Sequence, residues 1–125
     1  MTPSRPAALI VEDQPFVGMV ASDILRESGF QTFHAYDASA ATAVLQEHPE
    51  IEVVLTEAKL PGEVDGIELC RRVSRDRPNV QLVVTATGGD LPESGVPDGA
   101  TVLRKPYASG ELRTLVAAKS LLADA

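Results

Sequence analysis

The sequence has little cysteine and no long apolar run, and both absences restrict where the protein works. Cys70 is the single cysteine among 125 residues, which excludes an internal disulfide and fits a reducing cytoplasm. No apolar run approaches the roughly 20 residues of a spanning helix. No segment is basic and amphipathic enough for a membrane surface, and residues 1–7 lack the apolar core of a secretory signal. We therefore expect a cytoplasmic protein without a membrane partner.

Basic residues are also scarce. The chain has 11 Lys and Arg against 18 Asp and Glu, a formal net charge of −7. Binding to nucleic acid requires a basic face, so we expect no nucleic-acid partner. A glycine-rich phosphate loop of the G-x-x-x-x-G-K type is missing too, which excludes a nucleotide enzyme of that kind. The length corresponds to one domain with a core of its own.

Short apolar runs rich in β-branched residues recur along the chain. The clearest lie at residues 9–11, 51–55, 80–84 and 101–103, and residues 31–36 form a less apolar run typical of an edge strand. Runs of this kind are typical of a parallel sheet that is covered on both faces. Segments with helical spacing alternate with them, at residues 15–28, 39–48, 67–77 and 109–122. The alternation predicts an α/β fold, a doubly wound parallel sheet with helices on both faces.

Local signals mark the ends of the predicted helices. Phe16 and Val20 fall on the helical spacing that follows Pro15. Ser109 is the predicted N-cap of the last helix, and Leu122 belongs to its predicted apolar stripe. Glycines and prolines crowd residues 87–100, which leaves room there for no more than one helical turn.

Polar residues of different chemistry follow the predicted strands. Parallel sheets bind ligands outside the carboxyl ends of their strands, so these side chains are expected to share one crevice. They are Glu12, Asp13, Glu57, Thr85 and Lys105. Carboxylates suit Mg²⁺, and a hydroxyl and an ammonium suit a phosphoryl group. Taken alone, Asp13 equally fits a helix cap, Thr85 a strand residue and Lys105 a surface lysine; the combination favours the cation and phosphoryl site. His34 and His48 fall away from these strand ends in the predicted topology, so each is expected to be structural or on the surface.

Five short motifs occur in order along nearly the whole chain. They are Glu12-Asp13, Leu60-Pro61-Gly62, Asp65-Gly66, Thr85-Ala86 and Lys105-Pro106-Tyr107. With this spacing the chain resembles the receiver domain of two-component response regulators. The resemblance implies a five-stranded sheet of order 2-1-3-4-5 and a single receiver domain over residues 8–123, after a loose tail at residues 1–7. It also implies a subgroup whose fourth helix is shortened.

The same resemblance assigns roles to residues. Glu12, Asp13, Glu57 and the backbone carbonyl of Lys59 match the ligands of a Mg²⁺ ion. Thr85 matches the switch hydroxyl and Lys105 the lysine that pairs with phosphate. The implied partners are a histidine kinase or phosphotransfer protein and a downstream protein that contacts the fifth strand and the last helix, which is the family's helix five.

Two positions depart from the family pattern. Glu57 stands at the phosphoacceptor position, where the family has aspartate. Its additional methylene extends the carboxylate by about 1.3 Å. A misplacement of about 1 Å can cost on the order of a hundredfold in a phosphoryl transfer that depends on position. The longer acid also brings its oxygens nearer to those of an acyl phosphate, so Glu57 is expected to imitate the phosphorylated state imperfectly. Val102 replaces an aromatic residue that swings inward in many receivers.

Three functions remain open from the sequence. The first is a receiver-like signalling module, not an enzyme, whose phosphorylation at Glu57 is weak or absent and whose Mg²⁺ binding is weak or absent. The second is a receiver that is phosphorylated at Glu57, or one in which Glu57 is an engineered phosphomimic. The third is a Mg²⁺-dependent phosphohydrolase, which the lack of an Asp-x-Asp at any strand end disfavours. We expect the first.

Overall fold

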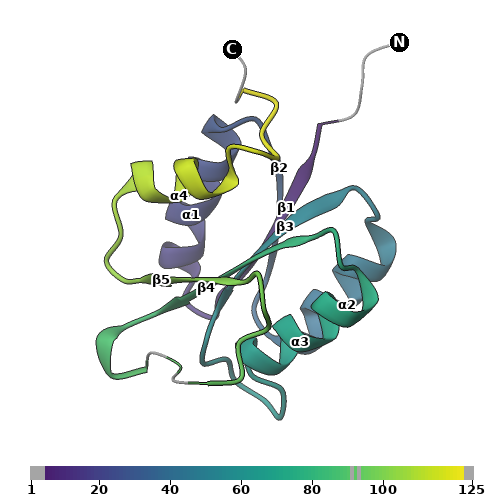
Figure 1. The fold of residues 1–125 in the computed structure, drawn as a ribbon, viewed down its shortest axis with the longest axis vertical. Helices are drawn as coiled ribbons and strands as arrows, with labels where there is room; N and C mark the ends of the chain where they lie inside the picture. Colours follow the sequence, from purple (N-terminus) through teal and green to yellow (C-terminus); the bar gives the residue numbers. More distant parts are fainter. Residues whose placement is uncertain (1–4, 91, 93, 123–125) are drawn as a thin grey trace.

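Strands and helices alternate along the chain in the computed structural model, which describes residues 5–90, 92 and 94–122 (Figure 1). In chain order the elements are β1 (Ala7–Val11), α1 (Pro15–Glu27), β2 (Gln31–Ala35), α2 (Ala38–Glu47), β3 (Ile51–Glu57), α3 (Gly66–Asp76), β4 (Gln81–Ala86), β5 (Thr101–Arg104) and α4 (Ser109–Val116). All neighbouring strands pair in parallel, in the order β2-β1-β3-β4-β5. The predicted fold class and strand order are confirmed.

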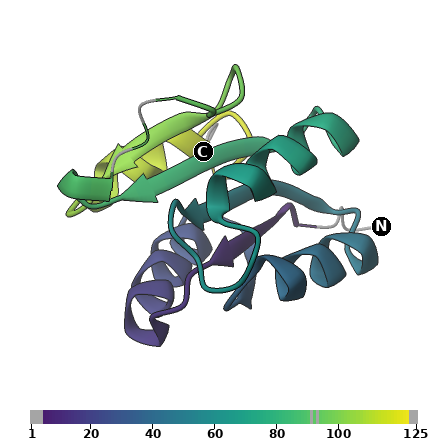
Figure 2. The same ribbon diagram turned by 90° about the horizontal axis from the view of Figure 1, so that it is seen from below.

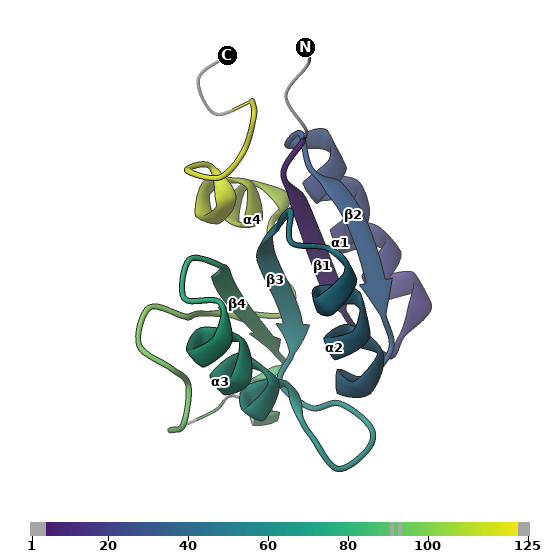
Figure 3. The same ribbon diagram turned by 90° about the vertical axis from the view of Figure 1, so that its right-hand side faces the viewer.

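Two layers of helix cover the sheet, one on each face. Strands β1 and β3 are buried along nearly their whole length, because alternate residues of each strand pack against opposite layers. One core lies under α2 and α3 and includes Cys70, and the other lies under α1 and α4. Figure 2 shows the sheet between these two pairs of helices, and Figure 3 shows α2 and α3 in front of it.

The register brings the carboxyl ends of the strands to one level. Glu57 at the end of β3 is paired with Thr85 of β4. Ala86 is paired with Arg104 of β5, so Lys105 follows directly at the same edge. Side chains that are far apart in the sequence therefore meet at this edge, as the sequence analysis expected.

The helix α1 turns a different face to the core than its apolar spacing suggests. Its buried residues include Gly18, Ala21, Ile24 and Leu25. Phe16 and Val20 are 72% and 44% exposed. A small residue, Gly18, thus faces inward where a large one would not fit, and the two larger side chains face solvent.

The last helix is shorter than predicted. It ends at Val116, and Leu122 lies beyond it with 52% of its surface exposed. Ser109 is its first residue and Ala108 its N-cap, so the predicted Ser109 cap is wrong. The Glu111 carboxylate accepts a hydrogen bond of 3.0 Å from the backbone N–H of Ala108, which is the half of a capping box that the third helical residue supplies.

The first strand begins close to the predicted start of the domain. Ala7 is buried within β1, so the ordered sheet begins one residue inside the predicted tail. Residues 1–4 of that tail, and residue 123 at the predicted end of the domain, lie outside the described residues. Between β4 and β5 the described residues form only the short 3₁₀ turn Gly88–Asp90, as the glycines and prolines predict. Among the described residues no helix is both long and apolar enough to cross a bilayer.

Candidate functional site

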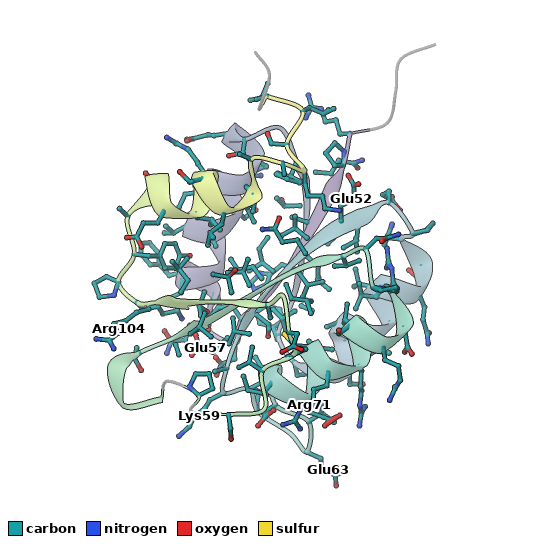
Figure 4. All side chains as sticks on the ribbon, in the orientation of Figure 1. Glu52, Glu57, Lys59, Glu63, Arg71 and Arg104 are labelled. Atoms are coloured by element: carbon teal, nitrogen blue, oxygen red, sulfur yellow. The ribbon has the colours of Figure 1, made fainter. Side chains whose placement is uncertain are left out.

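Four polar side chains meet at the carboxyl ends of the sheet strands. Glu12 follows β1, Glu57 ends β3, Thr85 lies in β4 and Lys105 follows β5. Glu12, Glu57 and Thr85 are only 4%, 8% and 3% exposed. Buried carboxylates require a partner, and Lys105 is the cation that reaches them. Figure 4 shows Glu57 at one end of β3 and Glu52 at the opposite end.

Lys105 bridges the two buried acids. Its Nζ lies 2.7 Å from Glu12 Oε1 and also donates a hydrogen bond to Glu57 Oε2. The Thr85 Oγ1 lies 3.4 Å from the same Glu57 oxygen. The expected meeting of Lys105, Glu57 and Thr85 on one rim is therefore confirmed as geometry.

The backbone around Glu57 depends on a close approach by α3. A Cβ placed on Gly66 would lie 1.8 Å from the Glu57 carbonyl oxygen, so no side chain fits there. Asp65 caps α3 by accepting a hydrogen bond of 2.9 Å from the Glu68 N–H. The Asp65-Gly66 motif thus starts the helix directly against the strand end that carries Glu57.

The backbone of Lys105 is held in a similar way by β4. Its N–H donates a hydrogen bond of 2.8 Å to the Ala86 carbonyl, which continues the pairing of β5 with β4. The lysine stem therefore starts from a fixed point one residue beyond the strand. This anchoring directs the ammonium toward the acids and distinguishes Lys105 from the exposed Arg104 before it.

Burial and ion pairing act in opposite directions on the two charged partners. Burial raises the pKa of Glu57 above 4.5; the Lys105 hydrogen bond and charge offset part of this effect, and the nearby Glu12 adds to it. Burial alone would lower the pKa of Lys105, but the hydrogen bonds and charges of Glu12 and Glu57 outweigh it and raise the pKa above 10.5. Lys105 therefore remains charged throughout the physiological range.

Two of the predicted Mg²⁺ ligands, Glu12 and Glu57, are buried, whereas the predicted ligand Asp13 is exposed. The Lys59 side chain is exposed as well, and the role of its backbone carbonyl stays a prediction. In the described part of the chain no three His, Cys, Asp or Glu side chains are arranged to hold a metal ion. The two buried acids are instead drawn toward Lys105.

Little space remains between these side chains. A cavity of about 10 Å³ is lined by residues that include Glu12, Glu57, Thr85, Lys105 and Tyr107. A volume near 10–15 Å³ holds about one water molecule. Two larger hollows beside α2 are lined by other residues; one of about 490 Å³ faces the loop before α3, and one of about 590 Å³ faces α3.

His34 contacts the site, although its position in the sequence predicted a place away from the strand ends. Its Nε2 lies 3.0 Å from the backbone carbonyl oxygen of Glu12, and its ring lies over Gly18 of α1. The parallel register explains the contact, because His34 is paired with Ile10, two residues before Glu12. The pairing of the edge strand was the signal that could have placed it. His48, by contrast, stacks on Phe33 and contacts Glu50.

Comparison with known proteins identifies the family of the chain. Residues 8–117 match the model of the response regulator receiver domain. Sporulation initiation phosphotransferase F of Bacillus subtilis (strain 168) is 31% identical over 112 residues, which cover 86% of this chain and 88% of that protein. The response regulator receiver protein CpdR of Brucella abortus (strain 2308) is 32% identical over 111 residues, again 86% and 88% of the two chains.

Solved structures share the fold. A receiver domain protein from Clostridium thermocellum superposes with a TM-score of 0.81 at 21% identity, over 91% of this chain and 93% of that one. The receiver domain of NtrX from Brucella abortus superposes with a TM-score of 0.77 at 25% identity, over 91% and 97%. With the family match over most of its length, the chain belongs to the response regulator receiver domain family of two-component systems.

Proposed function

We propose that this receiver domain is a cytoplasmic signalling module that works through protein contacts, with phosphorylation at Glu57 weak or absent. One observation carries the proposal: Glu57 Oε2 is contacted by both the Lys105 ammonium and the Thr85 hydroxyl. The resemblance to receivers assigns these two groups to a phosphoryl oxygen. An acid that already meets both of them stands in, imperfectly, for an acyl phosphate.

The reach of the acid supports the same proposal. Glu57 is one methylene longer than aspartate, and its Oε2 already meets Lys105 and Thr85. In-line transfer requires the phosphorus to approach the acceptor oxygen at a defined distance and angle. The closed arrangement of Glu57 and Lys105 opposes that approach.

Partners are proposed from the family and from the surface beside the site. Receiver domains interact with histidine kinases and phosphotransfer proteins, and we propose that such a protein contacts α1 next to Glu12. There Phe16, Met19 and Val20 are 72%, 52% and 44% exposed and follow the i, i+3, i+4 spacing of one helix face. A downstream protein is proposed to contact β5 and α4, where Val102 is 38% exposed.

The direct test is incubation with acetyl phosphate and Mg²⁺, followed by intact mass. We expect little or no species carrying one added phosphoryl group. Glu57→Asp restores the family acceptor and is expected to label, whereas Glu57→Gln serves as the matched control without a nucleophile. Rapid stoichiometric labelling of the unchanged chain would establish a phosphorylatable receiver instead. Steady release of inorganic phosphate that Glu57→Gln abolishes would favour a phosphohydrolase.

A further inference from the structure

We infer that the Lys105 ammonium occupies the place of a divalent cation in this receiver, so that the unchanged chain does not bind Mg²⁺ at its strand ends. The inference deepens the proposed function and rests on it for the role of the crevice. The Mg²⁺ that the family implies does not fit the residues as they are arranged here. The reasons lie in the hydrogen bonds of the acids, the volume beside them and the charge that they share.

The hydrogen bonds leave the two buried acids few open positions. Glu12 Oε1 accepts from Lys105 Nζ at 2.7 Å, and Glu12 Oε2 accepts from the backbone N–H of Gln14 at 3.3 Å. Glu57 Oε2 accepts from Lys105 and lies within reach of the Thr85 hydroxyl. Three of the four carboxylate oxygens are therefore engaged by groups of the chain itself.

The void beside the acids offers no alternative place for an ion. Mg²⁺ takes six ligands at 2.0–2.1 Å and usually keeps several of its waters. The cavity that Glu12, Glu57 and Lys105 line together with Gly18 and Ala21 of α1 is about 10 Å³, enough for about one water. A hydrated ion would therefore have to approach from the strand ends, where the ammonium already contacts both carboxylates.

The charges explain why one ammonium is enough to neutralise most of the repulsion between the two acids. The side chains of Glu12, Glu57 and Lys105 are only 6%, 10% and 16% exposed, so water screens them little. Two carboxylates at this depth repel each other, and one positive charge in contact with both removes most of that cost. Without Lys105 the same two acids would be unneutralised, and a divalent cation would become the most favourable replacement.

The test follows from this substitution of one cation for another. Thermal unfolding is measured in about 10 mM MgCl₂, which saturates a site of millimolar Kd, and in EDTA with NaCl at equal ionic strength. We expect the Tm of the unchanged chain to differ by less than about 1 °C between the two conditions, and that of Lys105→Met to rise in MgCl₂ by about 5 °C. Arg104→Met removes the exposed neighbouring charge and is expected to behave like the unchanged chain.

Two outcomes would overturn the inference. One is a saturable rise of several degrees for the unchanged chain in MgCl₂. The other is a folded Lys105→Met that does not respond to MgCl₂. If Lys105→Met does not fold, Mn²⁺ is titrated into the unchanged chain and its amide resonances are recorded. Selective, saturable broadening around Glu12 and Glu57 contradicts the inference, and its absence supports it. Labelling by acetyl phosphate is read separately by mass, so failure of the proposed function is distinguishable from failure of this one.

Discussion

The Lys105 ammonium and the Glu57 carboxylate are in direct contact, although 48 residues separate them in the sequence. They extend from the ends of β5 and β3, and β4 lies between these strands. Their contact therefore exists only when three strands are in register. It links the fold of the sheet to the chemistry of the receiver crevice.

Replacing Lys105 should destabilise the protein strongly. Lys105→Met leaves Glu12 and Glu57 buried without a counter-charge, and removing one partner of a buried ion pair costs about 3–5 kcal/mol. In the Glu57→Gln background the same change should cost about 1–3 kcal/mol less, because only one buried carboxylate is then left without a counter-charge. Urea unfolding of the four proteins in EDTA measures this coupling. Equal costs in both backgrounds would show that the ion pair does not contribute.

The carboxyl of Glu57 should titrate above its usual value of 4.5, because burial raises its pKa more than Lys105 lowers it. As the pH falls from neutral, Glu57 then protonates first in the folded chain, so its contribution to the free energy of unfolding increases until the unfolded chain is protonated as well. The contribution of Lys105 is complete below 10.5 and is lost only as the pH rises through its raised pKa. The chemical shift of Glu57 Cδ against pH measures the first midpoint, with Glu57→Gln to assign the resonance. A midpoint at or below 4.5 would contradict this prediction.

Much of the fold could be predicted because its signals are local. The apolar runs around Leu9, Val54 and Val83 are buried on both faces, which is typical of a parallel sheet between two helical layers. The meeting of the polar residues at the strand ends could be predicted as well, because parallel strands place their carboxyl ends at one edge. The face of α1 that meets the core could not be predicted, because helical spacing alone does not tell which face that is. Phe16 and Val20 fit the spacing but are exposed.

The detailed pairing within the site could not be read from the sequence. Asp13 was expected to share the crevice with the other acids, yet Lys105 contacts Glu57 and Glu12 while Asp13 is exposed. Which of two adjacent acids faces inward depends on how the chain leaves β1, and no residue pattern encodes that. The His34 contact with Glu12 likewise depends on the register of an edge strand.

Gly66→Ala should disrupt the backbone that carries Glu57. The new Cβ would lie 1.8 Å from the Glu57 carbonyl oxygen, and a strand end cannot yield as a flexible side chain can. We expect a loss of about 3 kcal/mol or more in the free energy of unfolding. Gly110→Ala is the matched control, because nothing lies within 4 Å of its Cβ position in α4. That change should stabilise the protein by about 0.5–1 kcal/mol. Similar losses for both would contradict the close approach.

Arg77→Lys should destabilise the connection between α2 and β3. The guanidinium donates to the carbonyls of Leu45, His48, Pro49 and Ile51, at 3.1, 3.4, 2.9 and 2.8 Å. A lysine retains the charge but has no planar group to reach both sides of the loop. We expect a loss of about 2 kcal/mol by urea unfolding, since hydrogen bonds from a charged donor contribute about 1.5–3 kcal/mol. The control Arg75→Lys, at a side chain that is 71% exposed, should change stability by less than about 0.5 kcal/mol.

The contact between His34 and the Glu12 backbone can be tested through Gly18. Gly18→Ala would place a methyl group 2.6 Å from His34 Cε1 and Nε2, so the ring must leave its position near the Glu12 carbonyl. We expect a loss of about 1–2 kcal/mol in the free energy of unfolding. In the His34→Ala background the methyl group meets no ring, and the same change should instead stabilise α1 by up to about 1 kcal/mol, because alanine is the better helix former. A change of sign between the two backgrounds is the expected result of the double-mutant cycle. If Gly18→Ala costs the same in both, the ring does not rest on α1, and His34 has no part in holding the loop that carries Glu12.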